Sequence, residues 1–210
     1  MKILTIEQEI ELLNNAGNFI GNGSSRAVYE IEYDGKPCVL KVYLDKAGEV
    51  QTNNEIEMCK NYEGMFANIY AVGHCCIVAE KVDLIDGYVI ECAVSGCPYD
   101  EYLDRENEPE LSEPEYEELC GLLEMIEGAL GYSCDNDQVG FSKEQDIFVA
   151  YDYGYTSDID FDEQVGSMDD YITWLGERGI LSAAIHMAVQ KMPFEEKWAI
   201  REYNYEEFEG

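Results

Sequence analysis

Two stretches near the amino terminus decide the fold, Ile20-Gly21-Asn22-Gly23-Ser24-Ser25-Arg26-Ala27-Val28-Tyr29 and Cys38-Val39-Leu40-Lys41-Val42. The first has two glycines in a turn, and the second has a lysine inside an apolar strand. Glycine lets a backbone approach a ligand closely because it has no Cβ, whereas burying an ammonium group is costly unless the group is paired. Glu55, on the helix expected next, is a suitable partner. The glycine turn, Lys41 and Glu55 together predict a phosphate-binding arrangement.

Lys41 on its own has a simpler interpretation. In a half-buried strand, successive side chains point to opposite faces, so the lysine would point to solvent beside an apolar face. The glycine pair upstream and Glu55 downstream favour the phosphate-binding interpretation instead.

The hydrophobic pattern of the first 82 residues predicts a small sheet with one packed helix. Residues 6–16 have the periodicity of an amphipathic helix. The remaining elements are expected as strands at 18–22, 26–33, 37–44, 68–73 and 75–82, a hairpin turn at Asp34-Gly35 and a helix at 50–63. This order predicts a five-stranded antiparallel sheet.

The composition changes near Val82, which we take as the boundary between a lobe at 1–82 and a reduced, acidic lobe at 83–210. The second lobe is expected to be mainly helical, with residues 84–103 ambiguous and an acidic linker running into a helix. The expected elements are that helix at 113–130, short strands near 138–142 and 146–151, and two or three helices from Ser167 onward. The predicted fold class is two-lobed α+β.

The charge of the chain is extreme and uneven. Its formal net charge is −32. Residues 83–210 contain 6 Lys/Arg and 33 Asp/Glu, so this part alone carries −27. Such a surface repels phosphates, which argues against direct binding of nucleic acid. Two interpretations stay open: solubility in a crowded or salty cell, and attraction to a basic protein partner, including mimicry of nucleic acid.

Other features favour a cytoplasmic protein without a membrane span. No apolar run approaches the ~20 residues that a bilayer requires, and the start MKILTIEQEIELL lacks the pattern of a signal peptide. The 8 cysteines form no C-x-x-C pair and there are only 2 histidines, so the spacing argues against a zinc site. His74 and His186 are interpreted as structural residues.

These motifs resemble the protein-kinase-like fold, in particular a divergent group of short bacterial and phage kinase-like proteins whose glycine loop reads G-x-G-S-S-R. The resemblance covers residues 18–82 well and residues 119–154 weakly, and residues beyond it resemble no family. It implies ATP and Mg²⁺ as ligands, a nucleotide-binding first lobe and a location in the cytoplasm of a bacterial host.

The resemblance assigns the nucleotide site residue by residue. Lys41 would contact the α and β phosphates, and Glu55 would hold the lysine in an ion pair. The third glycine of the family loop is Arg26 here. Backbone groups of Glu80 and Val82 would bind adenine. The full set assigned to the nucleotide is Gly21, Gly23, Val28, Lys41, Glu55, Glu80 and Val82.

In the second lobe the resemblance is partial. Asp152 ends a strand and is followed by an aromatic residue and a glycine, as in D-F-G, and would bind Mg²⁺. Gln138 matches the second metal ligand of the family. Ser133 falls on the family's catalytic aspartate and cannot accept a proton as a carboxylate does. Asp135 or Asp137 could take that role in a shortened loop, or could belong to an acidic turn. The H-R-D and A-P-E motifs are absent.

Two functions therefore stay open. The first is a minimal ATP-dependent phosphotransferase, or its degenerate pseudokinase form, with Asp135 or Asp137 near the acceptor hydroxyl. The second is a non-catalytic interaction or inhibitor protein of phage or mobile-element type, whose acidic second lobe binds a basic, nucleic-acid-binding protein.

Overall fold

The computed structural model describes residues 1–22, 26–105, 110–130 and 138–153, and the single positions 177, 179, 185, 188 and 191. These residues divide into two compact units. The first unit contains residues 1–54 and 68–80 together with the five single positions, and the second contains 55–67 and 81–153.

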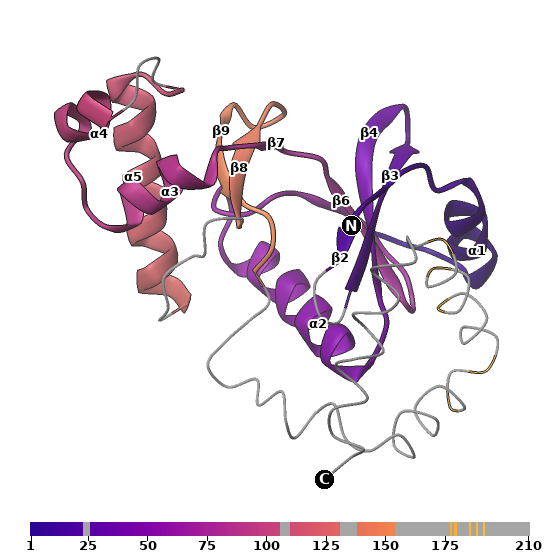
Figure 1. The fold of residues 1–210 in the computed structure, drawn as a ribbon. Helices are drawn as coiled ribbons and strands as arrows, with labels where there is room; N and C mark the ends of the chain where they lie inside the picture. The colour runs from indigo at the N-terminus through magenta and orange to yellow at the C-terminus, as the bar shows by residue number, and fades with distance from the viewer. Residues whose placement is uncertain are drawn as a thin grey trace, which may run out of the picture. The chain divides into compact units, whose positions relative to one another are not determined.

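The first unit is built on a six-stranded mixed sheet in the order β1-β5-β6-β4-β3-β2. Figure 1 labels four of its strands, β2, β3, β4 and β6. The strands are β1 (Lys2–Ile3), β2 (Phe19–Asn22), β3 (Arg26–Tyr33), β4 (Lys36–Tyr43), β5 (Ile69–Val72) and β6 (Cys76–Glu80). The five expected strands form the antiparallel part, β2 to β6. The expectation of a purely antiparallel, five-stranded sheet was wrong, because Lys2 and Ile3 add a parallel strand along β5.

The hairpin turn between β3 and β4 confirms the prediction from Asp34-Gly35. Asp34 and Gly35 have φ of 50° and 75°. Two successive left-handed residues form the turn whose twist matches that of the flanking strands. The turn sets a regular register from the Tyr33↔Lys36 pair to the Arg26↔Tyr43 pair. This register decides which residues of β4 share a face with which residues of β3.

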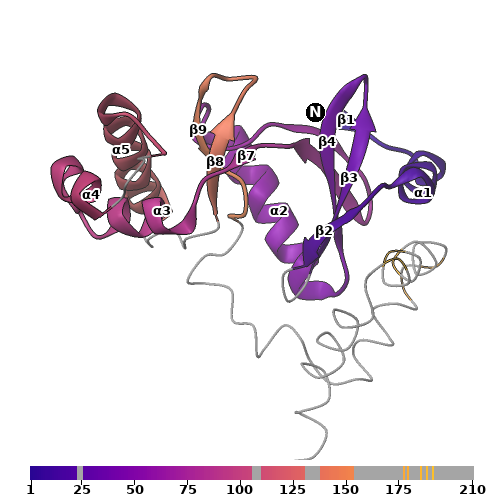
Figure 2. The same cartoon turned by 45° about the horizontal axis from the view of Figure 1, so that its top comes forward.

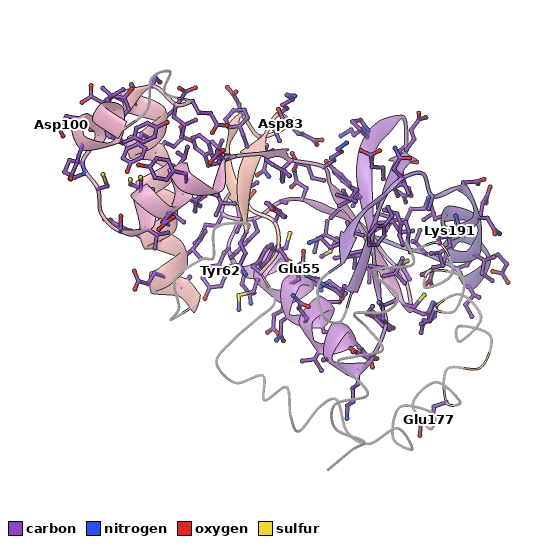
Figure 3. All side chains as sticks on the ribbon, viewed as in Figure 1. Glu55, Tyr62, Asp83, Asp100, Glu177 and Lys191 are labelled. Carbon is purple, nitrogen blue, oxygen red and sulfur yellow. The ribbon has the colours of Figure 1, made fainter. Side chains whose placement is uncertain are left out.

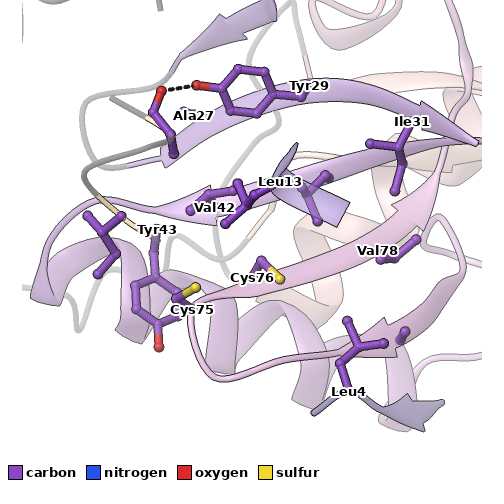
Figure 4. Packing of buried hydrophobic residues seen from close by; sticks show 14 of the residues in the cluster. Leu4, Leu13, Ala27, Tyr29, Ile31, Val42, Tyr43, Cys75, Cys76 and Val78 are labelled. Carbon is purple, nitrogen blue, oxygen red and sulfur yellow. Dashed lines mark hydrogen bonds between the residues drawn. The ribbon is translucent and has the colours of Figure 1, made fainter. Parts of the chain in front are cut away.

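Helix α1 (Ile6–Asn15) covers one face of this sheet. The Thr5 hydroxyl accepts a hydrogen bond from the Gln8 amide, and the Gln8 side chain accepts one from the Thr5 amide, which forms a capping box. Leu13, from the apolar stripe of the helix, is fully buried against the strands (Figure 4). The strand residues in this core include Ala27, Tyr29, Ile31, Cys38, Leu40, Val42, Cys76 and Val78.

Residues from the end of the chain complete the same core. Ile185 and Ala188 are buried at 1% and 0% exposure within it. The Tyr29 hydroxyl donates a hydrogen bond to the Ala188 carbonyl, drawn as a dashed line in Figure 4. Lys191, labelled in Figure 3, donates to carbonyls at the end of α1, namely those of Leu13, Asn14 and Ala16. A cation there complements the carbonyl end of the helix.

Helix α2 (Lys46–Asn61) begins at the half-buried carboxylate of Asp45. The Asp45 carboxylate accepts a hydrogen bond from the Gly48 amide at 2.8 Å, and the Asp45 carbonyl accepts one from the Glu49 amide at 3.1 Å. This is the pattern of a helix N-cap. Burial raises the pKa of the Asp45 carboxyl from 3.8 to about 6, against the lowering effect of the amides of Gly48 and Ala47. The charged form of this cap therefore costs stability.

Replacing Asp45 by Asn is expected to stabilise the protein increasingly as the pH rises. The folded-state pKa of Asp45 lies above its unfolded value, so the stability that its neutral form contributes is lost as pH rises through about 6. Asparagine keeps an oxygen for the Gly48 amide and has no charge to desolvate. We expect the free energy of unfolding of Asp45→Asn to exceed that of the parent by about 1–3 kcal/mol at pH 8, and by less toward pH 5. Urea unfolding measures this difference.

The exposed N-cap Asp86, which accepts a hydrogen bond from the Tyr88 amide at 2.8 Å, provides a matched control. An exposed carboxylate has little desolvation cost, so Asp86→Asn should give no comparable gain. If the difference in unfolding free energy between Asp45→Asn and the parent stays constant from pH 5 to pH 8, the charge of Asp45 does not control the stability of this cap.

The second unit combines three helices with a small antiparallel sheet in the order β7-β8-β9 (Figure 2). Its elements are β7 (Asp83–Leu84), α3 (Gly87–Val94), α4 (Tyr99–Arg105), α5 (Glu113–Leu130), β8 (Val139–Ser142) and β9 (Ile147–Ala150). The predicted helix at 113–130 and the two predicted short strands are confirmed, and the ambiguous residues 84–103 contain α3 and most of α4. None of the helices in the described part of the chain is long and apolar enough to cross a membrane.

Candidate functional site

The sheet register of the first unit aligns three of the predicted nucleotide residues. Gly21 of β2 is the partner of Val28 in β3, and Val28 is the partner of Lys41 in β4. Lys41 in turn pairs with Ile77 of β6. Direct partners in neighbouring strands share a face of the sheet. Gly21, Val28, Lys41 and Ile77 therefore form one row across four strands, which we call the Lys41 row.

The Lys41 row lies on the face of the sheet opposite α1. Leu40 and Val42, the neighbours of Lys41 in β4, belong to the core that α1 covers, and side chains alternate along a strand. Lys41 is nevertheless only 5% exposed. The interpretation of Lys41 as a solvent-facing lysine is therefore wrong. A buried ammonium group in an apolar strand demands anionic or dipolar partners, which is a property of binding sites as well as of structural ion pairs.

Gly21 has no local structural reason to be a glycine. Its φ is not in the left-handed region, and a Cβ built on it would meet no atom of the residues that the structure describes within 4 Å. A side chain would therefore fit, although it would fill the space beside Val28. Glycine at such a position permits close approach of a ligand to the backbone. Gly23, the second predicted glycine, lies outside the described residues.

Helix α2 buries three polar side chains, of which the sequence analysis anticipated only Glu55. Gln51, Thr52 and Glu55 are exposed by only 4%, 3% and 1%, and the spacing of three and four residues places them on one face. The Thr52 hydroxyl has no hydrogen-bond partner among the residues that the structure describes. Glu55, labelled on α2 in Figure 3, belongs to the second compact unit, and its pairing with Lys41 stays a prediction.

The two predicted adenine-binding positions lie in different units. Glu80 ends β6, and its carboxylate accepts hydrogen bonds from the amide and the side chain of Asn68 at 3.2 and 2.8 Å. The Glu80 amide donates to the Asn68 carbonyl at 2.8 Å, and the predicted contact of its backbone with adenine stays a prediction. Val82 is buried in the second unit with Ala67 and Val149.

The hairpin of β8 and β9 brings the predicted metal ligands near each other in register. Val139 pairs with Ala150, and the next residues outward are Gln138 and Tyr151, whose backbone hydrogen bond is 2.8 Å long. Asp152 directly follows Tyr151 and is half-buried. The open end of this hairpin therefore holds both predicted metal positions. Asp135 and Asp137, the candidates for the catalytic base, lie outside the described residues.

A second cluster of reactive side chains, in the first unit, was missed by sequence reasoning. Glu9 of α1 is 0% exposed and lies beside the turn that joins β5 to β6. His74 and Cys75 belong to that turn, and Cys76 follows as the first residue of β6. The pKa of the Cys76 thiol is raised, first by its hydrogen bond with Cys75 and then by burial. The available signal was an acidic residue in the apolar stripe of α1, four positions before Leu13.

Comparison with models of known protein families and with curated protein sequences gives no match to this chain.

Proposed function

We propose that this protein is a kinase-like nucleotide-binding protein that takes ATP with Mg²⁺ at the Lys41 row. The observation that carries the proposal is the alignment of Gly21, Val28 and Lys41 in one cross-strand row. The three residues lie on one face of the sheet and have complementary properties. Gly21 permits a ligand to approach the backbone closely. Val28 offers an apolar surface for a flat ring, and the buried Lys41 offers a positive charge for phosphates.

Two further observations support the proposal. The strand order β2-β3-β4-β6-β5 resembles the sheet of a kinase first lobe. The β8–β9 hairpin carries Gln138 and Asp152 at its open end, which are the family positions for Mg²⁺. A carboxylate and an amide oxygen suit a hard cation, although two carboxylates would bind it more tightly.

In this site the chain supplies positioning and electrostatics. Lys41 would neutralise phosphate charge, Glu55 would hold the lysine, and Asp152 with Gln138 would bind Mg²⁺. A phosphotransferase also needs a base within reach of the acceptor hydroxyl. If Asp135 or Asp137 supplies that base, the protein is a minimal kinase. If neither does, it is a pseudokinase that binds nucleotide without transferring phosphate.

The Mg²⁺ dependence of nucleotide binding tests the assignment of Asp152. We expect Asp152→Ala to remove the extra thermal stabilisation that Mg²⁺ adds to ATP, because the carboxylate is the only charged metal ligand assigned. The measurement is a thermal-shift titration with ATP, with and without Mg²⁺. Glu144→Ala, which changes an exposed carboxylate at the other end of the hairpin, is the matched control. Equal binding of Mg·ATP by Asp152→Ala and the parent would make Asp152 a structural turn residue.

A non-catalytic interaction protein is the second candidate, favoured by the net charge of −27 over residues 83–210. Complementary charge speeds association with a basic partner, and salt slows it. The ATP titration separates the two candidates. If ATP does not stabilise the parent protein, the acidic surface is the remaining functional feature. The better assignment is then an inhibitor of a basic, nucleic-acid-binding protein.

A further inference from the structure

Four residues converge at one end of the first sheet. Glu9 comes from α1, His74 and Cys75 come from the turn between β5 and β6, and Cys76 is the first residue of β6. The buried Glu9 carboxylate accepts hydrogen bonds from the amides of His74 and Cys75 at 2.7 and 3.0 Å. The thiols of Cys75 and Cys76 lie 3.2 and 3.6 Å from its Oε2 atom. Both cysteines are free thiols, labelled side by side in Figure 4.

The spacing of these atoms fits a metal ion. The carboxylate oxygen and the two sulfur atoms all lie within 4.8 Å of one another. A tetrahedral zinc ion with Zn–S of ~2.3 Å and Zn–O of ~2.0 Å holds sulfur and oxygen ligands about 3.5 Å apart. The observed distances from Glu9 Oε2 to the two sulfurs, 3.2 and 3.6 Å, bracket that value. The two distances between the carboxylate oxygen and the sulfurs therefore need to change by only a few tenths of an ångström.

The two oxygens of Glu9 have separate partners. The His74 ring, through Nδ1, and the His74 amide both contact Oε1 at 2.7 Å, whereas both thiols approach Oε2. An imidazole and an amide that hold Oε1 orient Oε2 toward the sulfurs, as outer partners do in metal sites. A Cβ at Gly73 would lie 2.4 Å from the Glu9 Cδ atom, so the turn closes over the carboxylate only because residue 73 is glycine.

The chemistry of the donors selects the type of ion. Two thiolates and one carboxylate suit a thiophilic divalent cation such as Zn²⁺, and not Mg²⁺ or Ca²⁺, which take oxygen ligands. The His74 side chain is 50% exposed and lies at the cluster, so the site borders the surface. Zinc binding would release the two thiol protons to solvent, and the three anionic ligands would more than neutralise the ion.

From this geometry we infer that Glu9, Cys75 and Cys76 form a binding site for Zn²⁺ or a similar thiophilic divalent cation, with His74 as the positioning residue and one coordination position left for water. The site is separate from the Lys41 row, since Cys76 lies on the α1 face of the sheet. It ties α1 to the β5–β6 turn, so the bound ion is expected to stabilise the first unit.

Cobalt titration of the reduced full-length protein tests this inference. Co²⁺ replaces Zn²⁺ in such sites and gives a thiolate-to-metal charge-transfer band in the near ultraviolet. We expect the band to saturate at one equivalent and to disappear when Zn²⁺ is added. Cys75→Ser and Cys76→Ser should each reduce its intensity, and His74→Ala should weaken the apparent affinity by about 10- to 100-fold while leaving the band in place. Cys120→Ser, in α5, is the matched control and should bind as the parent does.

X-ray absorption of the parent protein with one equivalent of Zn²⁺ gives a result that requires no variant to fold. Two sulfur ligands with oxygen or nitrogen in the remaining positions are expected. No charge-transfer band with the parent, a band that survives in the folded Cys75→Ser/Cys76→Ser double variant, or a different sulfur count would overturn the inference. The cluster would then have only a structural role, in which the buried Glu9 carboxylate accepts hydrogen bonds from the amides of His74 and Cys75.

Discussion

Lys41→Met is expected to abolish the stabilisation of the protein by ATP while leaving the fold intact. Methionine has the length of the lysine stem and no charge, so it keeps the packing of β4 and removes the phosphate contact. A ligand at 100 times its dissociation constant stabilises by about 2.7 kcal/mol. For a chain of this size that loss corresponds to roughly 5–11 °C of thermal shift. The measurement is thermal unfolding with and without Mg·ATP.

Lys36→Met supplies the matched control for this experiment. Lys36 lies on the same strand but is exposed, at the far end of β4 beside the turn. Its replacement should leave the ATP shift as it is in the parent. If the parent responds to ATP and Lys41→Met responds equally, the nucleotide binds elsewhere and the Lys41 row is a structural feature. Circular dichroism at low temperature verifies that both variants fold.

Ile185→Ala is expected to destabilise the first unit by about 2–5 kcal/mol, the usual cost of truncating a fully buried aliphatic side chain. Ile185 is 1% exposed in the core formed by α1 and the sheet. Two contacts place neighbouring residues at the same core. Tyr29 donates a hydrogen bond to the Ala188 carbonyl, and Lys191 donates to a carbonyl at the end of α1. Urea unfolding and amide hydrogen exchange of β3 and β4 measure the effect.

Glu177→Ala is the control for this second prediction, because Glu177 belongs to the same part of the chain and is exposed. Its effect should stay within about 0.5 kcal/mol. Lys191→Met should give an intermediate loss by removing the cation at the end of α1. Unchanged exchange of the β3 and β4 amides in Ile185→Ala would mean that the end of the chain adds nothing to the stability of the first unit.

Some elements could be predicted because their causes are local. Asp34-Gly35 adopts a two-residue turn because both residues tolerate left-handed φ, and that turn sets the register of β3 and β4. The apolar stripe of residues 113–130 has the period of a helix. Residues 84–103 were ambiguous because a short apolar run such as Tyr88–Val94 is compatible with a strand or with a buried helix.

Other elements could not be predicted because they depend on distant partners. β1 has only two residues, Lys2 and Ile3, and exists as a strand because the edge of β5 is available to pair with it. Helix α2 begins at Lys46, before the predicted position, because the Asp45 carboxylate caps it by accepting a hydrogen bond from the Gly48 amide. The hydrophobic periodicity of the sequence predicts neither the pairing of β1 with β5 nor the cap at Asp45.

The sequence by itself determined the order of the strands along the chain, the position of Lys41 and the resemblance from which its role is proposed, because these depend on neighbours along the chain. Only the tertiary structure decided that Lys41 is buried in one row with Gly21 and Val28, and that Glu9 meets Cys75 and Cys76. The physical reason is that sheet register and helix packing bring together residues far apart in sequence. The spacing rules for metal ligands consider near neighbours, so they could not anticipate that a carboxylate from α1 lies beside the two thiols.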